Sequence, residues 1–336
     1  MKSPYLSIIL PIRMTESRTE LLSQIDNISL DEMIPPEIEF IIVDDGSPSP
    51  YASQIQEKCH TLNLRYLRLM SQAEPFSLAR TRNAGAAIAE GEFIMFQDLD
   101  ILPYHGFYRD LLIEIEAQEL AKSISSFLMI GVIYLTREGT ESYQPDKKHY
   151  YIDKMLQHDE AYIQKHSSGT SHILLHKKHF ETLGGYDEYF SKWGHEDIEF
   201  NARLILQDNL YSLPSNFLKD ERNFSNIYQY EGWKSLYRLY GDRTLYKGIV
   251  LFHAWHSNDK ESSYYDNKLK NKHYFHRKLE AHLQAYQKKQ GYQLSSKSPL
   301  LDRYQYARSP ENRLQCKSLL QTIYFTLKKK FRTSKK

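Results

Sequence analysis

Residues 93–100 read Phe-Ile-Met-Phe-Gln-Asp-Leu-Asp, an apolar run that ends in two carboxylates. A short aromatic and aliphatic run followed by polar residues is typical of a buried β-strand that has reached its end. In open sheets of parallel strands, ligands bind beyond the carboxyl ends of the strands. We therefore expect Asp98 and Asp100 to lie at the ligand-binding edge of a sheet.

Three similar apolar runs precede this stretch, with segments of helical periodicity between them. Further strands are expected at Leu6–Leu10, Phe40–Val43 and Leu64–Leu69, and helices around Glu16–Ser29, Tyr51–Leu62 and Ser77–Ala89. Repeated alternation of strand and helix is typical of a parallel sheet covered by helices. The predicted fold class is α/β, with a mixed, mainly parallel Rossmann-like sheet and helices on both faces.

Polar residues also follow the first two strands. Pro11 and Arg13 come after the first strand, and Asp44 and Asp45 come after the second. Asp44-Asp45-Gly-Ser is equally consistent with a simple polar turn, because Asp and Gly favour turns on their own account. Beside the other strand ends, an aspartate here is predicted to accept a hydrogen bond from a uracil N–H or a ribose hydroxyl.

The sequence has no Gly-x-Gly-x-x-Gly and no Gly-Lys-Ser/Thr motif, so another group must neutralise a diphosphate. Asp98-Leu99-Asp100 can hold a divalent cation for this purpose, since carboxylate oxygens suit Mg²⁺ and Mn²⁺. Asp-x-Asp is common by chance, but its place at a strand end favours a metal site.

The helix before this strand carries Arg80 and Asn83 on one face, which a solvated helix face would also explain. Its sequence, Ala-Arg-Thr-Arg-Asn-Ala-Gly at 79–85, resembles the Ala-Arg-x-x-Asn-x-Gly helix of inverting family-2-type glycosyltransferases with the GT-A fold. Ser-Ile-Ile-Leu-Pro at 7–11 and Val-Asp-Asp-Gly-Ser at 43–47 belong to the same resemblance. It implies a GT-A fold in which the residues beside the donor nucleotide are Pro11, Arg13, Asp44, Asp45, Arg80, Asn83, Asp98 and Asp100.

A second informative stretch, Gly184–Leu204, contains two glycines and then Trp193-Gly-His-Glu-Asp197. Apolar residues recur at helical spacing from Ile198 to Ile205, so the acidic pair opens a helix. Capping of that helix could account for the two carboxylates. A tryptophan that can stack on a sugar and glycines that admit a ligand to the backbone favour a binding site.

This stretch resembles the acceptor-side motif of β-1,4-galactosyltransferases and bacterial chondroitin-type polymerases, Gly-Gly-Phe followed by Trp-Gly-Gly-Glu-Asp. His195 stands where that motif has its second Gly. The resemblance implies that Asp197 is the general base and that Glu196 binds a hydroxyl of the donor sugar. Trp193, Gly194 and His195 are the implied sugar and acceptor contacts.

A later apolar run, Ile249–Phe252, ends in His253-Ala-Trp-His256. Two histidines at this spacing can share a metal if the backbone turns, although a bare His-x-x-His is more often structural. The segment is similar to the Met-x-x-His that completes the metal site of β-1,4-galactosyltransferases, with His253 in the Met position. The resemblance implies a Mn²⁺ or Mg²⁺ site formed by Asp100 and His256, with His253 as a further ligand.

The middle of the chain carries fewer signals. We expect a helix over Phe107–Leu120 and one buried strand over Phe127–Leu135. From Thr136 to Ser168 the chain is polar, which predicts a surface excursion or a loop that closes over the donor. The small residues 167–170 are candidates for the sugar pocket.

The 336 residues, 41% of them hydrophobic, are enough for a full core. We expect a GT-A domain at 1–292, with a nucleotide-binding half (1–105) and an acceptor-binding half (106–292). Two distant cysteines indicate no disulfide framework, and neither a spanning helix nor a signal peptide is predicted. The expected location is cytoplasmic.

The predicted extension, residues 293–336, is helical and basic. Residues 317–336 contain seven Lys and Arg and no acidic residue, a pattern typical of a helix on an anionic membrane surface or of a solvated terminus. We expect peripheral binding to the inner face of the cell membrane. Nucleic acid is not an expected partner, because the basic excess is confined to this tail.

Together these features predict a metal-dependent transferase that moves a sugar from a UDP-sugar to a glycan or lipid-linked glycan, with inversion to a β-linkage. The resemblance makes galactose or N-acetylgalactosamine the first expectation, in bacterial capsule or lipopolysaccharide synthesis. Two alternatives stay open. A sugar nucleotidyltransferase should carry a Gly-rich basic loop where this chain has 11–14, and a non-catalytic glycan-binding module need not keep the metal and base positions.

Overall fold

The computed structural model describes residues 3–71, 74–169, 171–192, 194–208, 210–221, 230–256 and 266–289. The chain divides into two compact units, one formed by residues 1–210 and 214–286 and the other by residues 211–213 and 287–336. The predicted extension at 293–336 and Trp193 lie outside the described residues. The boundary predicted after residue 292 stays a prediction.

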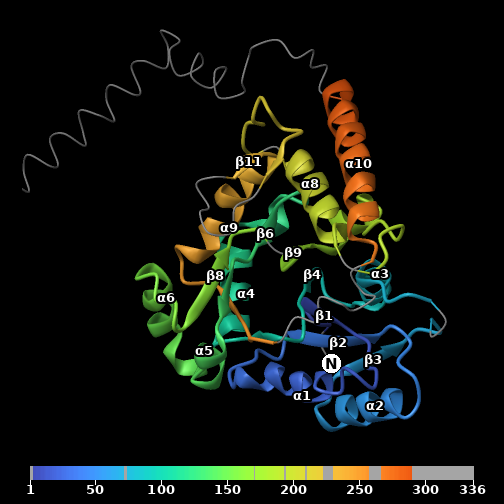
Figure 1. Cartoon of the computed structure of the whole chain (residues 1–336), viewed down its shortest axis with the longest axis vertical. Helices are drawn as coiled ribbons and strands as arrows, with labels where there is room; N and C mark the ends of the chain where they lie inside the picture. The colour runs from blue at the N-terminus through green and yellow to red at the C-terminus, as the bar shows by residue number, and fades with distance from the viewer. Residues whose placement is uncertain are drawn as a thin grey trace, which may run out of the picture. The chain divides into compact units, whose positions relative to one another are not determined.

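The larger sheet has six strands in the order β3-β2-β1-β4-β9-β6 (Figure 1). The parallel strands are β1 (Leu6–Ile12), β2 (Ile38–Asp44), β3 (Arg65–Arg68) and β4 (Phe93–Phe96), and β9 (Ile173–His176) and β6 (Phe127–Met129) add antiparallel pairings. All of β1 is buried, as expected of a central strand between two layers of helices. The predicted mixed, mainly parallel α/β sheet is confirmed.

Two of the three helices predicted in this half form as expected, namely α2 (Tyr51–Thr61) and α3 (Leu78–Ile88). The helix predicted at 16–29 is wrong: the structure has a short α1 (Leu21–Gln24) followed by the 3₁₀ segment η1 (Ile25–Leu30). The side chain of Asn27 in η1 donates to the carbonyl of Leu99 at 2.8 Å. Asx and Ser side chains compete with the helical backbone for hydrogen bonds, which shortens the helix.

The smaller sheet has four strands in the order β5-β12-β7-β8. They are β5 (Ile101–Leu102), β12 (Leu251–His253), β7 (Val132–Leu135) and β8 (Ile163–Ser167). The single strand predicted over 127–135 is therefore wrong, because β6 and β7 lie in different sheets. The chain passes from one sheet to the other between Ile130 and Gly131. The Ile130 N–H donates to the carbonyl of His172, next to β9 of the larger sheet, whereas the Gly131 carbonyl accepts from the N–H of Leu251 in β12 of the smaller sheet, both at 3.0 Å.

The polar segment 136–168 is also more regular than predicted. It contains α5 (Arg137–Glu141), the 3₁₀ segment η3 (Pro145–Lys147), α6 (Lys148–Leu156) and β8. Its tyrosines supply the apolar contacts, since the rings of Tyr143 and Tyr151 pack on Phe252. Most residues of 136–162 are nevertheless partly or fully exposed, in keeping with a surface excursion, and closure over the donor stays a prediction.

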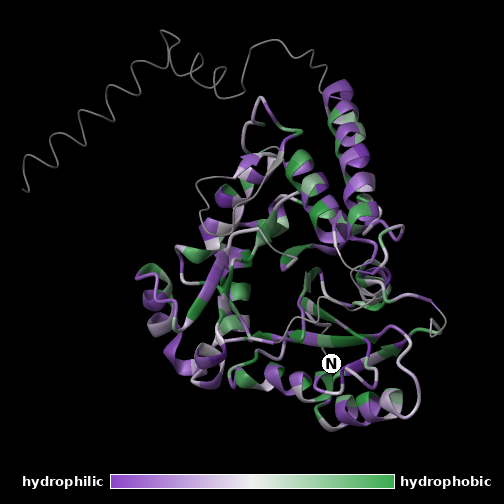
Figure 2. Cartoon of the chain, in the orientation of Figure 1, coloured by the Kyte–Doolittle hydropathy of each residue, from purple (hydrophilic) through white to green (hydrophobic). Residues whose placement is uncertain are grey.

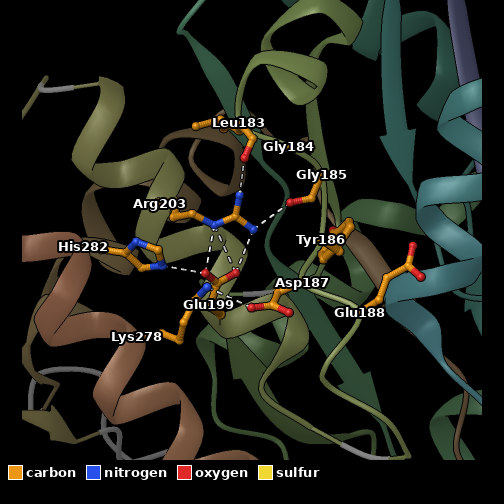
Figure 3. Close-up of a pocket in the computed structure, with 10 residues that line it drawn as sticks. All are labelled: Leu183, Gly184, Gly185, Tyr186, Asp187, Glu188, Glu199, Arg203, Lys278 and His282. Atoms are coloured by element: carbon orange, nitrogen blue, oxygen red, sulfur yellow. Dashed lines mark hydrogen bonds and ion pairs between the residues drawn. The ribbon is translucent and has the colours of Figure 1, made fainter. Parts of the chain in front are cut away.

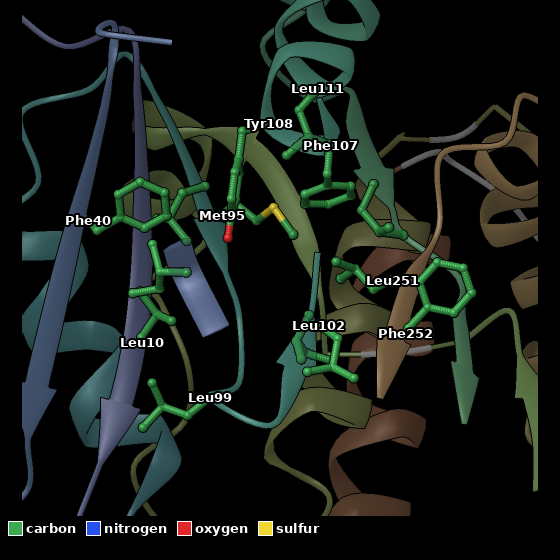
Figure 4. Close-up of a cluster of buried hydrophobic side chains, with 14 of the residues drawn as sticks. Leu10, Phe40, Met95, Leu99, Leu102, Phe107, Tyr108, Leu111, Leu251 and Phe252 are labelled. Carbon is green, nitrogen blue, oxygen red and sulfur yellow. The ribbon is translucent and has the colours of Figure 1, made fainter. Parts of the chain in front are cut away.

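One hydrophobic cluster joins the two sheets. Figure 4 shows Leu10, Phe40 and Met95 of the larger sheet and Leu251 and Phe252 of the smaller sheet on either side of α4 (Phe107–Ala117). Because both sheets share this core, the polar ends of their strands are held in fixed relation to one another.

The remaining elements surround the acceptor-side motif or complete the fold. They are η2 (Leu120–Lys122), α7 (Lys177–Thr182), α8 (Glu196–Asp208), β10 (Asp220–Glu221), β11 (Glu231–Gly232), η5 (Trp233–Leu236), α9 (Tyr237–Leu245) and α10 (Lys268–Lys289). Hydrophilic residues cover most of α10 (Figure 2), whose buried residues are Asn271, Phe275 and Leu279. Within the described ranges, no helix combines the length and hydropathy needed to cross a bilayer.

Candidate active site

Asp100, His253 and His256, which the family resemblance implied as metal ligands, lie close together, and their binding of a metal stays a prediction. Nε2 of His253 lies 3.2 Å from Asp100 Oδ2, and Nε2 of His256 lies 3.5 Å from the same oxygen. One candidate ligand atom from each residue lies within 4.8 Å of the others. The strand pairing explains this convergence, because His253 of β12 is opposite Ile101, the residue after Asp100.

The donor set fits a divalent cation. Asp100 Oδ1 is buried and has no hydrogen-bond partner among the described residues, and two imidazoles beside a carboxylate suit Mn²⁺ or a similar ion. Nδ1 of His253 lies 2.7 Å from the carbonyl of Ala254, which fixes this nitrogen as the donor and leaves Nε2 for a metal. Burial raises the pKa of Asp100, but the two histidines more than offset this and hold that pKa below its ordinary value.

A second cluster is built around Arg82, whose side chain is only 1% exposed. Nη2 of Arg82 lies 3.1 Å from Asp98 Oδ1, and Nη1 lies 3.2 Å from Glu196 Oε1. Its guanidinium also covers the ring of Tyr186 at 5.3 Å. The Arg82 guanidinium thus connects the Asp-x-Asp at the end of β4 to the acceptor-side motif at the start of α8.

The other oxygen of Asp98 is held by the segment before β9. Ser171 Oγ donates to Asp98 Oδ2 at 3.2 Å, and Nε2 of the buried His172 lies 3.8 Å from the same oxygen. The sequence prediction named neither of these residues, nor Arg82 and Tyr186. For Arg82 a signal existed: it falls on the same helix face as the buried Ala79 and Ala86, where a charge requires a partner.

Glu196 opens α8 and is 5% exposed. Burial, together with the neighbouring charge of Asp197, raises its pKa to about 7, while Arg82 acts in the opposite direction. Oε2 of Glu196 is buried, and no residue in the described part of the chain forms a hydrogen bond with it. A buried oxygen in this state suits a hydroxyl ligand, because an unsatisfied polar atom is costly to bury.

Asp197 is half-buried beside Glu196, and its Oδ1 accepts a hydrogen bond from the Ile198 N–H at 2.8 Å. This contact agrees with the capping alternative for one oxygen. Among the described residues, none donates to Asp197 Oδ2. The carboxylate can therefore serve the helix and still face a substrate with its second oxygen.

The chain before α8 adopts a left-handed conformation at two successive residues, Gly194 with φ of 99° and His195 with φ of 78°. This explains why a second glycine suits the position of His195, since a side chain there is strained. His195 compensates with burial, its ring lying 5.7 Å from that of Phe275 between centroids. At Gly194 an added Cβ meets no atom of the described residues within 4 Å, which is consistent with space for a ligand.

Asn83 holds the double-glycine turn. Its Oδ1 accepts from the Tyr186 N–H at 2.8 Å, and its Nδ2 donates to the Tyr186 carbonyl at 2.9 Å. Gly185 has φ of 67°, and a Cβ there would lie 2.6 Å from Asn83 Oδ1. The structure thus places Asn83, predicted beside the nucleotide, in contact with the acceptor-side loop.

Three of the predicted nucleotide residues, Arg13, Asp45 and Arg80, meet beyond the ends of β1 and β2. Arg80 donates from Nε and Nη2 to the two oxygens of Asp45, each at 2.9 Å, and Arg13 Nη1 lies 3.9 Å from Asp45 Oδ2. Ser71 Oγ and the Ser77 N–H also donate to this carboxylate, at 2.7 and 2.8 Å. Protein donors thus already surround Asp45, which is fully buried.

Asp44 is equally buried and accepts from Ser47 Oγ at 2.6 Å and Tyr66 OH at 2.8 Å. Pro11 lies within β1, where every residue is buried. Asp44 and Asp45 therefore shape the wall of this region. Any contact with a nucleotide stays a prediction.

A polar pocket of about 380 Å³ opens beside the turn after α7 (Figure 3). Arg203 forms an ion pair with Glu199 at 2.7 Å and donates to two backbone carbonyls. Lys278 pairs with Asp187 at 2.9 Å, and His282 with Glu199 at 2.6 Å. These charged side chains pair with one another within the protein. Their ion pairs connect α8, α10 and the acceptor-side loop around the pocket.

Comparisons with curated proteins give several partial matches. Polypeptide N-acetylgalactosaminyltransferase 6 of Mus musculus is 25% identical, over 49% of this chain and 29% of that protein. Hyaluronan synthase of Pasteurella multocida is 25% identical, over 50% of this chain and 19% of that protein. Chondroitin synthase of Pasteurella multocida (strain Pm70) is 24% identical, over 60% and 23%. The chain spans less than a third of the length of each of these relatives.

Among solved structures, TarS of S. aureus in complex with UDP matches with a TM-score of 0.42 and 18% identity, over 60% of this chain and 55% of that chain. A family model described as glycosyltransferase like family 2 matches residues 7–281. This range runs from β1 into α10 and contains both motif regions. Of the function classes that the sequence left open, a glycosyltransferase is the one that this match supports. The chain belongs to the glycosyltransferase-like family 2.

Proposed function

We propose that the protein transfers a sugar from a UDP-sugar to a glycan acceptor with inversion, and that it requires a divalent cation. The observation that carries the proposal is the proximity of two clusters. Asp100, His253 and His256 form a cation site, and Arg82 connects the adjacent Asp-x-Asp to Glu196. The proposed donor site and the proposed acceptor site thus meet where β4 ends and α8 begins.

Asp197 is the proposed general base. It takes the proton of the acceptor hydroxyl as that oxygen bonds to the anomeric carbon. The bond from this carbon to the diphosphate oxygen breaks on the opposite face, and UDP leaves with the electron pair. An α-linked donor therefore gives a β-glycoside. Asp197 Oδ2 accepts no hydrogen bond from the described residues, which supports the role of Asp197 as the base.

Asp100, His253 and His256 would hold Mn²⁺ or Mg²⁺. The cation would neutralise the diphosphate and so favour departure of UDP. Arg82 fixes Asp98 and Glu196 relative to one another, and Glu196 Oε2 is proposed to bind a hydroxyl of the donor sugar.

The remaining predicted residues divide between the two substrates. Pro11, Arg13, Asp44, Asp45, Arg80 and Asn83 are proposed to form or support the nucleotide pocket, and Trp193, Gly194 and His195 the acceptor side. The ion pairs of Asp45 with Arg80 and Arg13 support the first group. The space at Gly194 supports the second.

Galactose or N-acetylgalactosamine is our first proposal for the donor sugar, and one relative is named an N-acetylgalactosaminyltransferase. Two relatives are a hyaluronan synthase and a chondroitin synthase of a bacterium, which supports a glycan acceptor and a role in surface polysaccharide such as capsule or lipopolysaccharide. The basic residues 317–336 are proposed to bind an anionic membrane surface on the cytoplasmic side.

The test is release of UDP from a panel of UDP-sugars with Mn²⁺, Mg²⁺ or EDTA. We expect slow, metal-dependent hydrolysis of one donor by the native chain, and a loss of about 100-fold or more in Asp197→Asn. Asp153→Asn, at an exposed position of α6, is the matched control. No hydrolysis of any donor, with no metal-dependent binding of UDP by calorimetry, would refute the proposal.

A further inference from the structure

The turn after β12 gives the candidate cation site its second histidine. The strand ends at His253, and Nε2 of His256 then lies 3.5 Å from Asp100 Oδ2. The Ala254 N–H donates to the Asp100 carbonyl at 2.8 Å, which fixes the first residue of the turn. Two histidines three residues apart can reach one ion only while the backbone keeps this bend. The groups that hold the rest of the turn therefore matter for the site.

The middle residue of the turn, Trp255, is held by α5. Its backbone N–H donates to Thr140 Oγ1 at 2.7 Å. The guanidinium carbon of Arg137 lies 4.3 Å from the centre of the Trp255 ring. Arg137 and Thr140 are three residues apart in α5, so they share a face of this helix. Because both contacts reach one residue, α5 fixes the backbone and the side chain of the turn together.

Thr140 is itself held in place within α5. Its hydroxyl donates its single proton to the Thr136 carbonyl at 2.9 Å, which leaves the lone pairs of the oxygen to accept from Trp255. Thr136 caps α5, since its Oγ1 accepts from the Gly139 N–H at 3.0 Å, and the Thr136 N–H donates to the Tyr162 carbonyl at 2.9 Å. The helix is thus attached to the residue before β8, and Thr140 attaches the turn to the helix.

We propose that Thr140 is a positioning residue for the cation site, an inference that rests on the cation requirement of the proposed function. Its hydroxyl holds the turn in which His256 faces Asp100. Arg137 supports the same turn through the ring of Trp255. Without the hydroxyl, the partly buried N–H of Trp255 would lack its acceptor, and the turn would shift to satisfy it. Such a shift moves His256 relative to Asp100.

The affinity of the full chain for Mn²⁺, measured without substrate by electron paramagnetic resonance of the unbound ion, tests this role. Thr140→Val removes the hydroxyl at nearly constant shape, and Thr140→Ser keeps it. Thr61→Val is the matched control, because Thr61 Oγ1 in α2 also donates to the carbonyl four residues earlier. Arg137→Met, at an exposed position, removes the cation and keeps an apolar stem over the ring.

We expect Thr140→Val to weaken Mn²⁺ binding about tenfold and Arg137→Met about threefold, with affinity close to native in Thr140→Ser and Thr61→Val. A double-mutant cycle shows whether the effect passes through the second histidine. In the His256→Ala background, Thr140→Val should change the affinity little, because the ligand that it positions is absent.

Native affinity in Thr140→Val would overturn the inference, and so would a tenfold loss that persists in the His256→Ala background. A loss in Thr140→Ser as large as in Thr140→Val would also overturn it, since the hydroxyl would then not be the group that matters. A native chain that binds no Mn²⁺ would overturn the cation site and this inference together. Absent UDP release with normal Mn²⁺ binding would count against the proposed function alone.

Discussion

Arg82 is a buried cation held between two carboxylates, so its loss leaves Asp98 and Glu196 without their counter-ion. Breaking a buried ion pair by removing one partner typically costs about 3 kcal/mol or more. We expect Arg82→Met to lower the free energy of unfolding by about this amount in urea denaturation. UDP release should fall as well, because the two motifs lose their common contact.

The double variant Arg82→Met/Glu196→Gln should recover part of this stability, since one of the unpaired carboxylates is then neutral. Arg109→Met is the matched control, because the Arg109 side chain is 49% exposed and such pairs contribute little. If Arg82→Met were as stable as this control, the bridge would not stabilise the fold.

Glu196 gives a prediction on pH. Its pKa in the folded protein is raised to about 7 from 4.5, by burial first and then by Asp197, and it also faces Arg82, Asp98 and Tyr186. The folded state then binds more protons than the unfolded state between these values, so this group makes stability fall as pH rises. Glu196→Gln removes this loss of stability at high pH, because the glutamine side chain does not titrate. The variant should gain roughly 3 kcal/mol relative to the native chain between pH 4.5 and 8.

Glu199, one turn later in α8, is the control of opposite sign. Burial opposes its charged form, yet His282 and Arg203 hold its pKa below the ordinary value. Its contribution to stability is therefore lost as pH falls, and Glu199→Gln should differ most from the native chain at neutral pH. Urea denaturation across this pH range measures both variants. A difference for Glu196→Gln that stays constant with pH would contradict the assignment.

At the scale of elements, α10 forms hydrogen bonds with the loop that leads to α8. The buried Asn271 donates to the carbonyls of Ser191 and Gly194, at 3.1 and 3.0 Å. Asn271→Ala leaves two carbonyls without this donor, a loss of about 1–3 kcal/mol. We expect faster hydrogen exchange in residues 187–195 and a lower kcat for transfer, with the affinity for UDP unchanged.

Lys272→Ala is the control for this variant, because Lys272 is on the exposed side of the same helix. Equal exchange in the two variants would show that Asn271 does not hold the loop. Equal kcat with faster exchange would show that the loop's rigidity does not matter for transfer.

Element boundaries mark the limit of what the sequence could predict. The run from Phe127 to Leu135 is apolar throughout, and periodicity cannot show that a chain leaves one sheet for another when both strands are buried. In 136–168 the sequence does not show which tyrosines pack on Phe252, because a tyrosine carries both an apolar ring and a hydroxyl. The alternation in residues 6–96 was predictable, since strand and helix differ there in period.

At the scale of the whole molecule, the candidate cation site connects the two sheets. Asp100 follows β4 of the larger sheet and precedes β5 of the smaller sheet, and His253 ends β12. An ion that binds the folded chain raises its stability by about 2.7 kcal/mol at 100 times its Kd. We expect Mn²⁺ to raise the Tm of the native chain, and EDTA to reverse the increase.

His253→Ala and His256→Ala should each reduce this Mn²⁺-dependent increase. His149→Ala, at an exposed position of α6, should not. Calorimetric unfolding without substrate measures the effect independently of activity. The same Tm increase in all three variants would place the cation elsewhere.

The site was partly predictable for a related reason. Asp100, His253 and His256 each stand at the end of an apolar run, which makes each a candidate ligand, but only the resemblance to β-1,4-galactosyltransferases implied that they form one site. Ser171, His172 and Tyr186 sit beside elements whose pairing is antiparallel or irregular, and no local pattern shows which way they face. His195 was recognised as a departure, but its cause, a left-handed backbone, is visible only in the structure.

Arg82 and Asn83 are consecutive residues of α3, and they bind opposite ends of one segment. Arg82 forms an ion pair with Glu196 at the start of α8, and Asn83 accepts a hydrogen bond from the N–H of Tyr186 after the double glycine. An engineer who wished to change the proposed acceptor side could therefore not graft residues 185–196 from another protein as an independent module. The graft would have to bring a glycine that clears Asn83 and a carboxylate that reaches Arg82. Chimeras that respect these two attachment points should fold, and those that ignore them should not.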